Sequence, residues 1–472
     1  MSDIALFQID KGFFKRQIMK ASLFCYLILF VGLLFISYQV QSREQNSSTN
    51  YALTDKYWKI ENSDGSLDSL EILEHQGRQS LLVKNGQKAF MKDVSFKNFV
   101  VDFYCNGQVP GFVFRKQDKN NYEYLYLRMM MSGRQDALQY VPIHNGSLPW
   151  QLYNYPKYEG FATYPRREVA TIPISLEDQL VSGKVDKSLL HSLKEKGVIF
   201  SEESFIDIPE GSPAYIFDPV SNEALLFEIN KEGIVFLDYK VWVRVRIEVL
   251  EDTMTIYVHD MDIPTFVVEN LKRDIQAGGI GFFSNFGDLY FSDFSIQEIE
   301  TANIHRTEKE ERQISPNYIT KWRMSEAFAK DSENYEQQVN SFLTHQDKFK
   351  KITADEDGLI NVSRFYEDME KSVIFTTTLL SDSEKEVVLN FDFADQLVIL
   401  LNSKTLYEGE MNFRPPSDKG AEGRVFVEDE EITLNLMSGR NRLTFVLTGD
   451  SRQKFNWGFI AKVSELNGIA FE

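Results

Sequence analysis

Short runs in which apolar and polar residues alternate recur along most of this chain. The clearest is residues 241–249 (VWVRVRIEV), where every odd-numbered residue is Val or Ile and every even-numbered one is Trp, Arg or Glu. Successive side chains of an extended strand point to opposite faces, so such a run buries one face and leaves the other in water. Similar runs cover residues 99–104, 111–115, 122–128 and 253–258. The pattern predicts a mainly β chain.

The same pattern returns near the C-terminus after a break. Residues 301–315 (TANIHRTEKEERQIS) are charged and almost free of large apolar side chains, which is typical of a linker. A chain of 472 residues also exceeds what one ordinary core encloses. We therefore expect two β-sandwich domains, residues 51–300 and 316–472. The strands predicted in the second domain are residues 373–379, 386–393, 397–401, 432–436, 441–447 and 458–463.

The first domain is interrupted at about residues 166–238, where helix signals replace the strand pattern. Residues 175–178 (SLED) resemble a capping box, and a helical pattern over residues 186–196 ends at Gly197, as a helix with a glycine cap would. We expect a small, partly helical insertion in the first sandwich.

An apolar segment near the N-terminus predicts export. Residues 21–40 are uncharged and long enough to span a hydrocarbon core as a helix. Lys and Arg residues gather in the preceding segment, residues 1–20, which the positive-inside rule keeps in the cytoplasm. The rest of the chain then lies in the periplasm or outside the cell.

The sequence is compatible with two outcomes for this segment: it is retained as an anchor, or it is cleaved off after export. Its length favours an uncleaved transmembrane signal anchor, whereas Val40 and Ser42 have the spacing of a signal-peptide cleavage site. The body is membrane-anchored in the first case and secreted in the second.

Charge and cysteine content narrow the partners and the compartment. With 70 acidic against 51 basic residues the formal net charge is -19, which disfavours nucleic acid as a partner. Cys25 lies in the apolar segment and Cys105 in the body, so the exported part can form no internal disulfide. Export without disulfides is typical of a bacterial envelope protein.

Several strands of the first domain follow one another in a familiar order. Residues 93–103 precede a GFVFR strand at 111–115 and a Tyr-rich strand at 121–128, and a GGIGF strand at 278–282 closes the domain. This order resembles the concanavalin A-like (laminin G and lectin-glucanase) jelly rolls of bacterial exported proteins. That superfold hosts lectins, hydrolases and adhesion domains, so the resemblance implies a fold rather than one activity.

The second domain carries Trp322, a DGLINV stretch at residues 357–362, LNSKTLYEG at 401–409 and WGF at 457–459. These stretches resemble a galactose-binding-domain-like jelly roll. Ser403 stands where such domains usually carry the glycine of an Asn-Gly hairpin, so the type of this turn stays open.

No catalytic string is present. The glycan-cleaving branch of the concanavalin A-like superfold uses a Glu-x-Asp-x-x-Glu strand whose carboxylates share one face, and this chain has none. Asp260 and Asp262 are better explained as the turn before Pro264. The chain also lacks a Gly-rich phosphate loop and a G-x-S-x-G elbow. We do not expect enzymatic activity.

Residues 136–164 are the segment richest in side chains that suit a sugar. Aromatic faces stack on the C–H face of a pyranose, while amide and carboxylate groups bind its hydroxyls. The segment also contains Tyr155, Tyr158 and Tyr164, which add aromatic rings to the candidate residues given below. The alternative is a loop that its own aromatic residues pin to the sandwich. The candidate carbohydrate-binding residues are Asp136, Gln139, Tyr140, His144, Asn145, Trp150, Gln151, Tyr153, Arg115 and Arg128.

The two arginines of that set end adjacent predicted strands. Arg115 and Arg128 would either order the sugar site or pair with surface carboxylates. Metal ligands are sparse, because the six histidines form no metal-binding spacing. The acidic stretch from Asp355 to Gly358 offers oxygen ligands for calcium, which is common in both superfolds, but a solvated turn explains it better. We expect no cofactor.

Together these patterns predict a membrane-tethered, extracytoplasmic glycan-recognition (lectin-like) or adhesion protein without catalytic activity. A glycan or glycoconjugate is the expected partner. Two alternatives remain: a hydrolase whose carboxylates come from loops, and a structural envelope protein whose domains contact other proteins.

Overall fold

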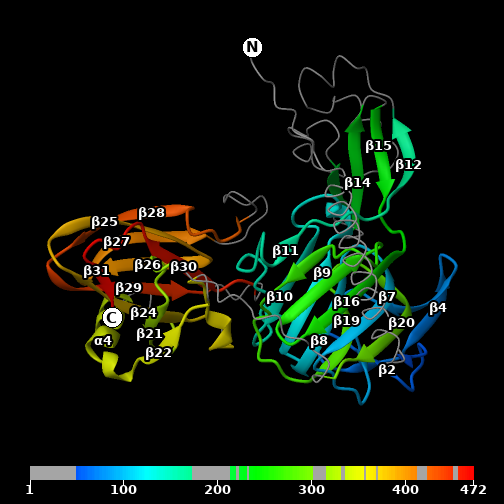
Figure 1. The fold of residues 1–472 in the computed structure, drawn as a ribbon, viewed down its shortest axis with the longest axis horizontal. Helices are drawn as coiled ribbons and strands as arrows, with labels where there is room; N and C mark the ends of the chain where they lie inside the picture. Colours follow the sequence, from blue (N-terminus) through cyan, green and yellow to red (C-terminus); the bar gives the residue numbers. More distant parts are fainter. Residues whose placement is uncertain are drawn as a thin grey trace, which may run out of the picture. The chain divides into compact units, whose positions relative to one another are not determined.

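The computed structural model describes residues 49–172, 213–218, 223–230, 233–300, 315–330, 335–355, 358–367, 370–411, 423–449 and 455–472. Residues 51–472 form one compact unit (Figure 1). Its strands pair in antiparallel sheets, which confirms the mainly β class.

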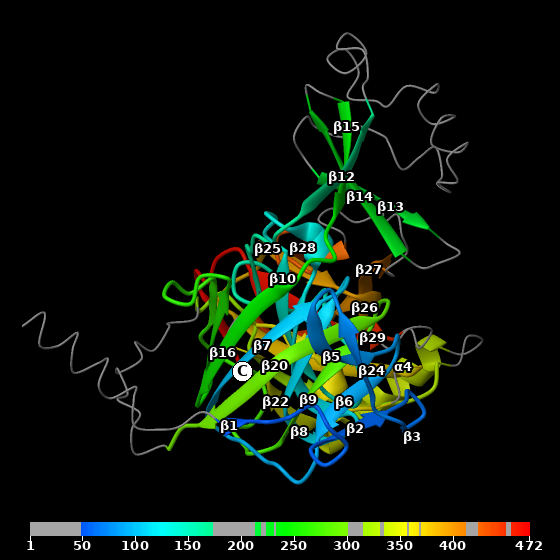
Figure 2. The same cartoon turned by 90° about the vertical axis from the view of Figure 1, so that its right-hand side faces the viewer.

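Two eight-stranded sheets build the first sandwich. The β7 sheet has the order β18-β17-β16-β7-β20-β5-β4, with β1 beside β20, and the β9 sheet has the order β11-β10-β9-β8-β19-β6-β2-β3. Figure 2 shows β7, β16 and β20 side by side. The strands of the β7 sheet are β1 (Thr49–Asn50), β4 (Glu71–His75), β5 (Arg78–Val83), β7 (Phe99–Asn106), β16 (Val243–Leu250), β17 (Thr253–Val258), β18 (Phe266–Val268) and β20 (Leu289–Glu298). Those of the β9 sheet are β2 (Trp58–Glu61), β3 (Leu67–Asp68), β6 (Lys88–Met91), β8 (Pro110–Asp118), β9 (Asn121–Leu127), β10 (Leu138–Ile143), β11 (Glu159–Gly160) and β19 (Gly279–Ser284), and the turn η1 (Met129–Met131) follows β9.

Aromatic rings from the two sheets meet between them. The ring centroids of Phe282 in β19 and Phe291 in β20 lie 3.8 Å apart, and those of Phe112 in β8 and Phe103 in β7 lie 5.7 Å apart. Strand β16 shows the predicted alternation, with its Val and Ile residues buried and its Arg and Glu residues partly exposed. Burial of one face of each strand therefore builds this core.

The insertion contains a third sheet. Strands β12 (Arg167–Ile172), β15 (Gly233–Asp238), β14 (Glu223–Asn230) and β13 (Pro213–Asp218) pair in this order. In Figures 1 and 2 these strands lie together, beyond the ends of the sandwich strands. The described part of the insertion is therefore strand rather than helix, because its runs of Val, Ile, Leu and Phe suit paired strands. The predicted helical residues, 175–178 and 186–197, lie outside the described residues.

The second sandwich pairs a seven-stranded sheet with a four-stranded one. The β29 sheet has the order β22-β21-β24-β29-β26-β27, with β31 beside β24, and the β25 sheet has the order β23-β30-β25-β28. Helix α4 (Tyr335–Thr344) packs Val339 and Leu343 against the β29 sheet. The strands are β21 (Lys321–Met324), β22 (Lys350–Thr353), β23 (Ile360–Asn361), β24 (Ser372–Ser381), β25 (Lys385–Phe393), β26 (Asp395–Leu401), β27 (Lys404–Met411), β28 (Glu430–Leu436), β29 (Gly439–Thr448), β30 (Gly458–Val463) and β31 (Ile469–Phe471), with the turns η4 (Gln346–Lys348) and η5 (Val362–Arg364).

The hairpin between β26 and β27 shows how the chain turns without glycine. Asn402 and Ser403 form this two-residue turn, and both have positive φ, of 51° and 70°. Such a turn matches the twist of the strands it joins, and Asn tolerates this conformation better than most residues. The expected hairpin thus forms with serine in place of glycine.

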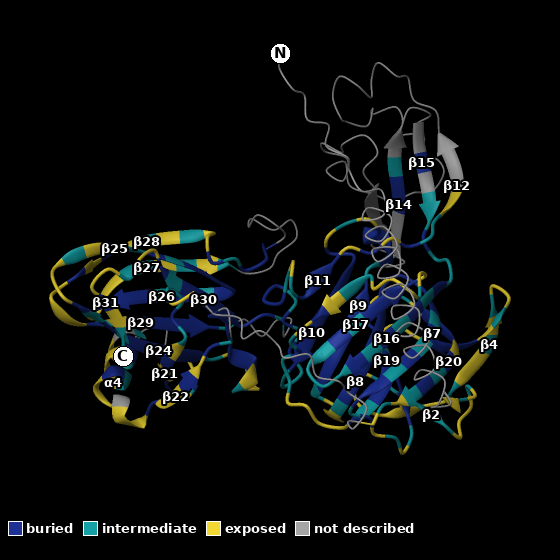
Figure 3. Ribbon diagram, in the orientation of Figure 1, coloured by how far each residue is buried: buried dark blue, intermediate teal, exposed yellow. Residues whose placement is uncertain are grey.

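The two sandwiches share buried surface. Apolar residues of the second sandwich, among them Val425, Val427 and Ile460, belong to the core cluster of the first. Strand β30 is mostly buried, whereas the edge strand β4 is mostly exposed (Figure 3). The predicted linker lies outside the described residues, apart from Ser315. The second sandwich is therefore packed onto the first, which the linker alone did not predict.

Among the described residues, no helix is long and apolar enough to cross a bilayer. The predicted spanning segment, residues 21–40, lies outside them.

Candidate functional site

The segment of residues 136–164 covers part of the outward face of the β9 sheet. Phe112 points into the core, so its neighbour Val113 and the paired Tyr124 point outward. Tyr126 lies on that outward face and is paired with Gln139. The amide of Gln139 donates to the carbonyl oxygen of Trp150 at 2.7 Å and also to that of Tyr153. The loop after β10 therefore folds back over the sheet.

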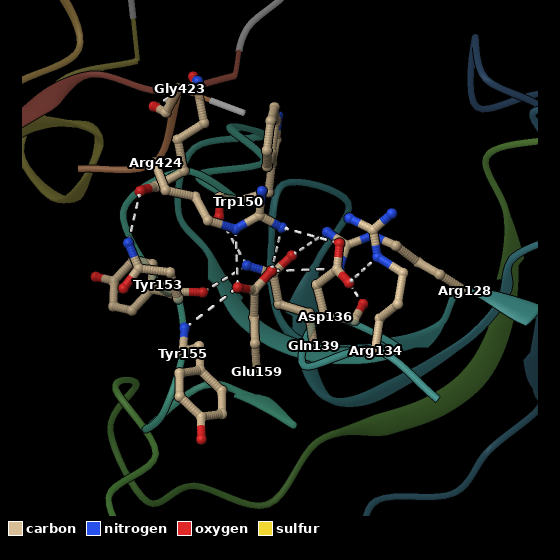
Figure 4. Close-up of polar contacts among 12 residues, drawn as sticks. Arg128, Arg134, Asp136, Gln139, Trp150, Tyr153, Tyr155, Glu159, Gly423 and Arg424 are labelled. Atoms are coloured by element: carbon tan, nitrogen blue, oxygen red, sulfur yellow. Dashed lines mark hydrogen bonds and ion pairs between the residues drawn. The ribbon is translucent and has the colours of Figure 1, made fainter. Parts of the chain in front are cut away.

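Glu159 is the centre of a buried ionic cluster (Figure 4). Its Oε1 accepts hydrogen bonds from Arg424 Nη2 at 2.6 Å and from Arg128 Nη1 at 3.2 Å. Its Oε2 accepts from Arg424 Nε at 2.8 Å and from the backbone N–H of Tyr155 at 3.2 Å. Arg424 belongs to the second sandwich, so this two-pronged pair joins the sandwiches.

Asp136 lies at the edge of the same cluster. Its Oδ1 accepts from Arg134 Nε at 3.2 Å, and its Oδ2 lies 3.7 Å from Arg424 Nη2. Arg128 donates to the carbonyl oxygen of Asp136 at 2.7 Å. Both carboxylates of the cluster are thus bound to guanidinium groups.

A tyrosine and an amide complete the cluster. Arg128 donates to Gln139 Oε1, and the hydroxyl of Tyr126 does the same. Burial raises the pKa of Tyr126 to about 12, so its hydroxyl keeps its proton and remains a donor. These bonds use the side-chain groups of Gln139 that a sugar hydroxyl would need.

Trp150, Gln151 and Tyr153 lie against the second sandwich. The guanidinium of Arg424 lies 5.2 Å from the ring centroid of Trp150. Gln151 receives a hydrogen bond from Asn456 and donates to the carbonyl oxygen of Gly423 at 2.7 Å. Its backbone N–H also donates to Asn456 Oδ1 at 2.8 Å.

Tyr153 is fully buried, and its hydroxyl accepts from Asn361 Nδ2 at 3.2 Å. Gly458 of β30 lies close to Leu152: a Cβ atom added to Gly458 would come within 2.7 Å of the Leu152 side chain. The loop and the second sandwich are thus closely packed.

The next candidates along the segment are also engaged. Tyr140 is buried and donates to Glu123 Oε2 at 2.6 Å. Asn145 donates to the carbonyl oxygen of Ser363 in the second sandwich at 2.8 Å.

His144 Nδ1 lies 2.8 Å from Arg273 Nη1 and accepts a hydrogen bond from it. Burial, with Arg273 and Arg364 nearby, lowers the pKa of His144 to about 3, so the ring is neutral at ordinary pH.

Arg115 does not join this group. It is buried and donates to the carbonyl oxygens of Lys97, at 2.8 and 2.9 Å, and of Glu251. Arg128 is therefore the one of the two predicted arginines that reaches the segment. Arg115 instead binds the backbone carbonyl groups of Lys97 and Glu251, away from the ionic cluster around Glu159.

The remaining aromatic residues divide into a buried and an exposed set. Tyr158 and Tyr164 are buried, whereas Tyr155 and Phe161 are exposed and contact each other edge to face, with centroids 6.2 Å apart. Tyr155 and Phe161 therefore form an exposed rim of this segment. Sequence reasoning missed Glu159, which lies inside the segment, and Arg424, whose separation of 265 residues offers no local signal.

A second group of aromatic and charged residues lies on the outward face of the β7 sheet. The guanidinium of Arg78 lies 3.7 Å from the ring centroid of Tyr104 and 5.8 Å from that of Trp242. His75 stacks on Tyr290 at 3.6 Å. All five side chains are partly exposed. We name this group the β7 aromatic face.

Charged groups border the β7 aromatic face. Asp102 accepts from Arg246 Nε at 3.0 Å and from Arg244 Nη2 at 3.3 Å. Trp242 and both arginines come from the polar half of the run at residues 241–249, so the sequence had marked them as the wet face of a strand. Nothing local showed that strands β4, β7 and β20 would bring their rings, and β5 its Arg78, beside this run.

In the described part of the chain, no group of three or more His, Cys, Asp or Glu residues could hold a metal ion. Asp355, the described acidic residue of the predicted calcium turn, accepts from Arg364 at 2.6 Å. The next two residues of that turn lie outside the described residues. The solvated acidic turn that we expect there stays a prediction.

Comparisons with known proteins give distant structural likenesses. No family and no curated protein matches the chain. Domain 4 of the extracellular arabinanase AbnA from Geobacillus stearothermophilus is 11% identical, covers 52% of this chain and 84% of its own, and has a TM-score of 0.25. The exoplasmic/lumenal domain of VIP36 in its Ca2+/Man3GlcNAc-bound form is 9% identical, with 56% and 94% covered and a TM-score of 0.26.

A legume lectin-like domain from Entamoeba histolytica is 11% identical, covers 52% of this chain and 91% of its own, and has a TM-score of 0.23. These TM-scores are too low to assign a fold or a ligand to this chain. Its β-sandwich architecture rests on its own strand pairing.

Proposed function

We propose that this chain is a non-enzymatic carbohydrate-recognition protein that binds glycans on the β7 aromatic face. One observation carries the proposal: partly exposed rings of Tyr104, Trp242 and Tyr290 gather on one sheet face beside Arg78. Rings of this kind stack on pyranose C–H groups, and flanking charged groups bind hydroxyls. The face is open to solvent, unlike the segment of residues 136–164.

The composition of this face also separates recognition from hydrolysis. Asp102, which borders this face, is paired with two arginines, Arg244 and Arg246, rather than with a second carboxylate. A site of this kind can bind and orient a sugar, but it offers no acid and base pair.

The test is a glycan array probed with the full chain, followed by titration of the strongest ligand. Trp242→Ala should weaken binding by about tenfold, since loss of about 1.4 kcal/mol of contact energy has that effect. Trp150→Ala is the matched control, because Trp150 lies at the sandwich junction. Binding that survives Trp242→Ala but is lost in Trp150→Ala would overturn the proposal in favour of the rim of residues 136–164. Release of reducing sugar from a bound polysaccharide would instead support a hydrolase.

We also propose that residues 21–40 tether this protein to a membrane, with the sandwiches in the periplasm or outside the cell. The support is the uncharged apolar segment and the basic residues before it. Mass spectrometry of the chain from membranes should find residues 1–20 attached. A mature chain that begins after Ser42 would show that the protein is secreted instead.

A further inference from the structure

Lysine side chains gather on the outward face of the β9 sheet, away from the β7 aromatic face. One row of cross-strand neighbours runs from Glu61 in β2 through Lys88 in β6 to Phe283 in β19. Lys59 and Lys116 lie beside this row, and their ammonium groups are 2.7 Å and 3.7 Å from the carboxylate of Glu61. Two lysines thus share one carboxylate and a third lies beside them, in a protein whose net charge is strongly negative.

Lys88 is the member of this group that has no acidic partner. Its Nζ lies 3.2 Å from the hydroxyl of Tyr122, and no carboxylate of the described residues comes within ion-pair distance. The ammonium sits 4.7 Å from the ring centroid of Phe283 and 4.9 Å from that of Tyr122. Ring faces partly offset the loss of water around a cation, but they do not neutralise it.

Glycines give the long side chains room to meet. Gly279 and Gly281 contribute no side chain to the outward face of β19 between β6 and β8, so that Phe283 is the large residue there. The ring of Phe90 lies over Gly281, and the ammonium of Lys116 lies 4.0 Å from the centroid of that ring. Lys88 and Lys116 therefore approach the same strip of sheet from its two sides.

We propose that Lys88 and Lys116 bind the carboxylate of an acidic sugar, whose ring contacts the partly exposed face of Phe283. A carboxylate would supply the counter-charge that Lys88 lacks and would form charge-assisted hydrogen bonds to both ammonium groups. The sugar half of the assignment rests on the proposed function, whereas the carboxylate half does not.

The protonation of Lys88 supports this assignment. Burial, followed by the charge of Lys116, lowers the pKa of Lys88 to about 8. The charged groups that act on Lys88 are Lys116 and Glu61, whose opposite charges leave the ammonium of Lys88 without a net counter-charge, and the hydroxyl of Tyr122 beside it is neutral. A bound carboxylate favours the charged ammonium, so affinity should fall as the pH rises through about 8.

The experiment titrates the full chain with sodium glucuronate, glucose and sodium acetate at constant ionic strength, by calorimetry. We expect glucuronate to bind and glucose not to bind. Lys88→Met, which keeps the length of the side chain, should weaken glucuronate binding by at least tenfold. Lys84→Met is the matched control, because Lys84 is exposed and pairs with Glu71 outside the cluster. Lys116→Met provides a second variant if Lys88→Met does not fold, as judged by circular dichroism.

The outcomes separate the parts of the proposal. Equal affinity for acetate and glucuronate would overturn the sugar assignment, and glucuronate binding that both variants leave unchanged would overturn the site. Failure of neutral glycans to bind the β7 aromatic face would refute the proposed function without affecting the carboxylate result.

Discussion

The two outward faces of the first sandwich differ in what lies on them. Much of the β9 sheet is covered, by the loop of residues 136–164 and then by the second sandwich, and Tyr124, Tyr126 and Gln139 on that face are buried. The β7 sheet keeps Tyr104 and Trp242 partly exposed. Both faces carry aromatic and charged residues, so composition alone does not distinguish a packed surface from a binding surface.

The difference lies in the partners of the charged groups. In the covered region, each oxygen of Glu159 accepts two hydrogen bonds from within the protein. On the open face, Asp102 and its arginines are 22% to 39% exposed and can still reach solvent or a ligand. A saturated network holds parts of the protein together, whereas a partly solvated one can exchange water for another molecule.

The largest expected effect comes from breaking the covered region. Arg424→Ala leaves Glu159 buried with one guanidinium fewer, so it should lower the free energy of unfolding by about 3–5 kcal/mol. Urea denaturation measures this change. Arg440→Ala is the control, since Arg440 pairs with Glu472 at the surface and should cost no more than about 1 kcal/mol. Equal effects of the two substitutions would contradict the role assigned to the cluster.

A second effect is pH dependence from Glu123, which lies on the core side of β9. Burial raises the pKa of Glu123 from 4.5 to about 7, so the folded state binds this proton more tightly than the unfolded chain. The stability it contributes is present below pH 4.5 and is lost as the pH rises through about 7, on the order of 3 kcal/mol in all. Glu123→Gln should remove this decline.

Asp102→Asn, on the open face of the β7 sheet, is the control for Glu123→Gln. It leaves Glu123 in place, so the decline assigned to Glu123 should remain in this variant. Thermal melts across this range compare the two variants, and a decline that persists in Glu123→Gln would count against the assignment.

A smaller loss is expected where the loop meets the second sandwich. Gln151→Ala removes the partner of Asn456 and of the carbonyl oxygen of Gly423, which should cost about 1–3 kcal/mol. Gln117→Ala is the control, because the Gln117 side chain is exposed and its hydrogen bond to the carbonyl oxygen of Ala277 lies at the surface. Similar unfolding midpoints for both variants would show that the junction contributes little.

The smallest effect on stability is expected on the open face. Trp242→Ala should change the free energy of unfolding by less than about 1 kcal/mol, since surface substitutions rarely do more. The same variant should weaken glycan binding, which separates a binding residue from a packing one. A large loss of stability would mean that the ring of Trp242 is part of the packing.

Local pattern was a good guide to the strands. The predicted run at residues 458–463 coincides with β30, and the run at residues 99–104 lies within β7. Asp260 also forms the expected turn, since its Oδ1 accepts the backbone N–H of Asp262 at 2.9 Å. These features depend on neighbours in sequence, so a single chain shows them.

The candidate site shows where local pattern fails. Residues 136–164 have the composition of a sugar site, and Asp136, Gln139 and Arg128 do come together as expected. Their partners, however, include Arg424 from another domain. The composition of a segment shows which side chains it contains. It does not show which of them are already hydrogen-bonded to other parts of the fold.

By itself the sequence determined the strands, the break between the two sandwiches and the strongly acidic balance of the chain, because each of these depends on residue type and short-range order. Tertiary structure alone decided which aromatic face would be covered and which would stay open. The physical reason is distance along the chain: a hydrogen bond between residues 159 and 424 leaves no periodic trace, and only folding shows that it is made.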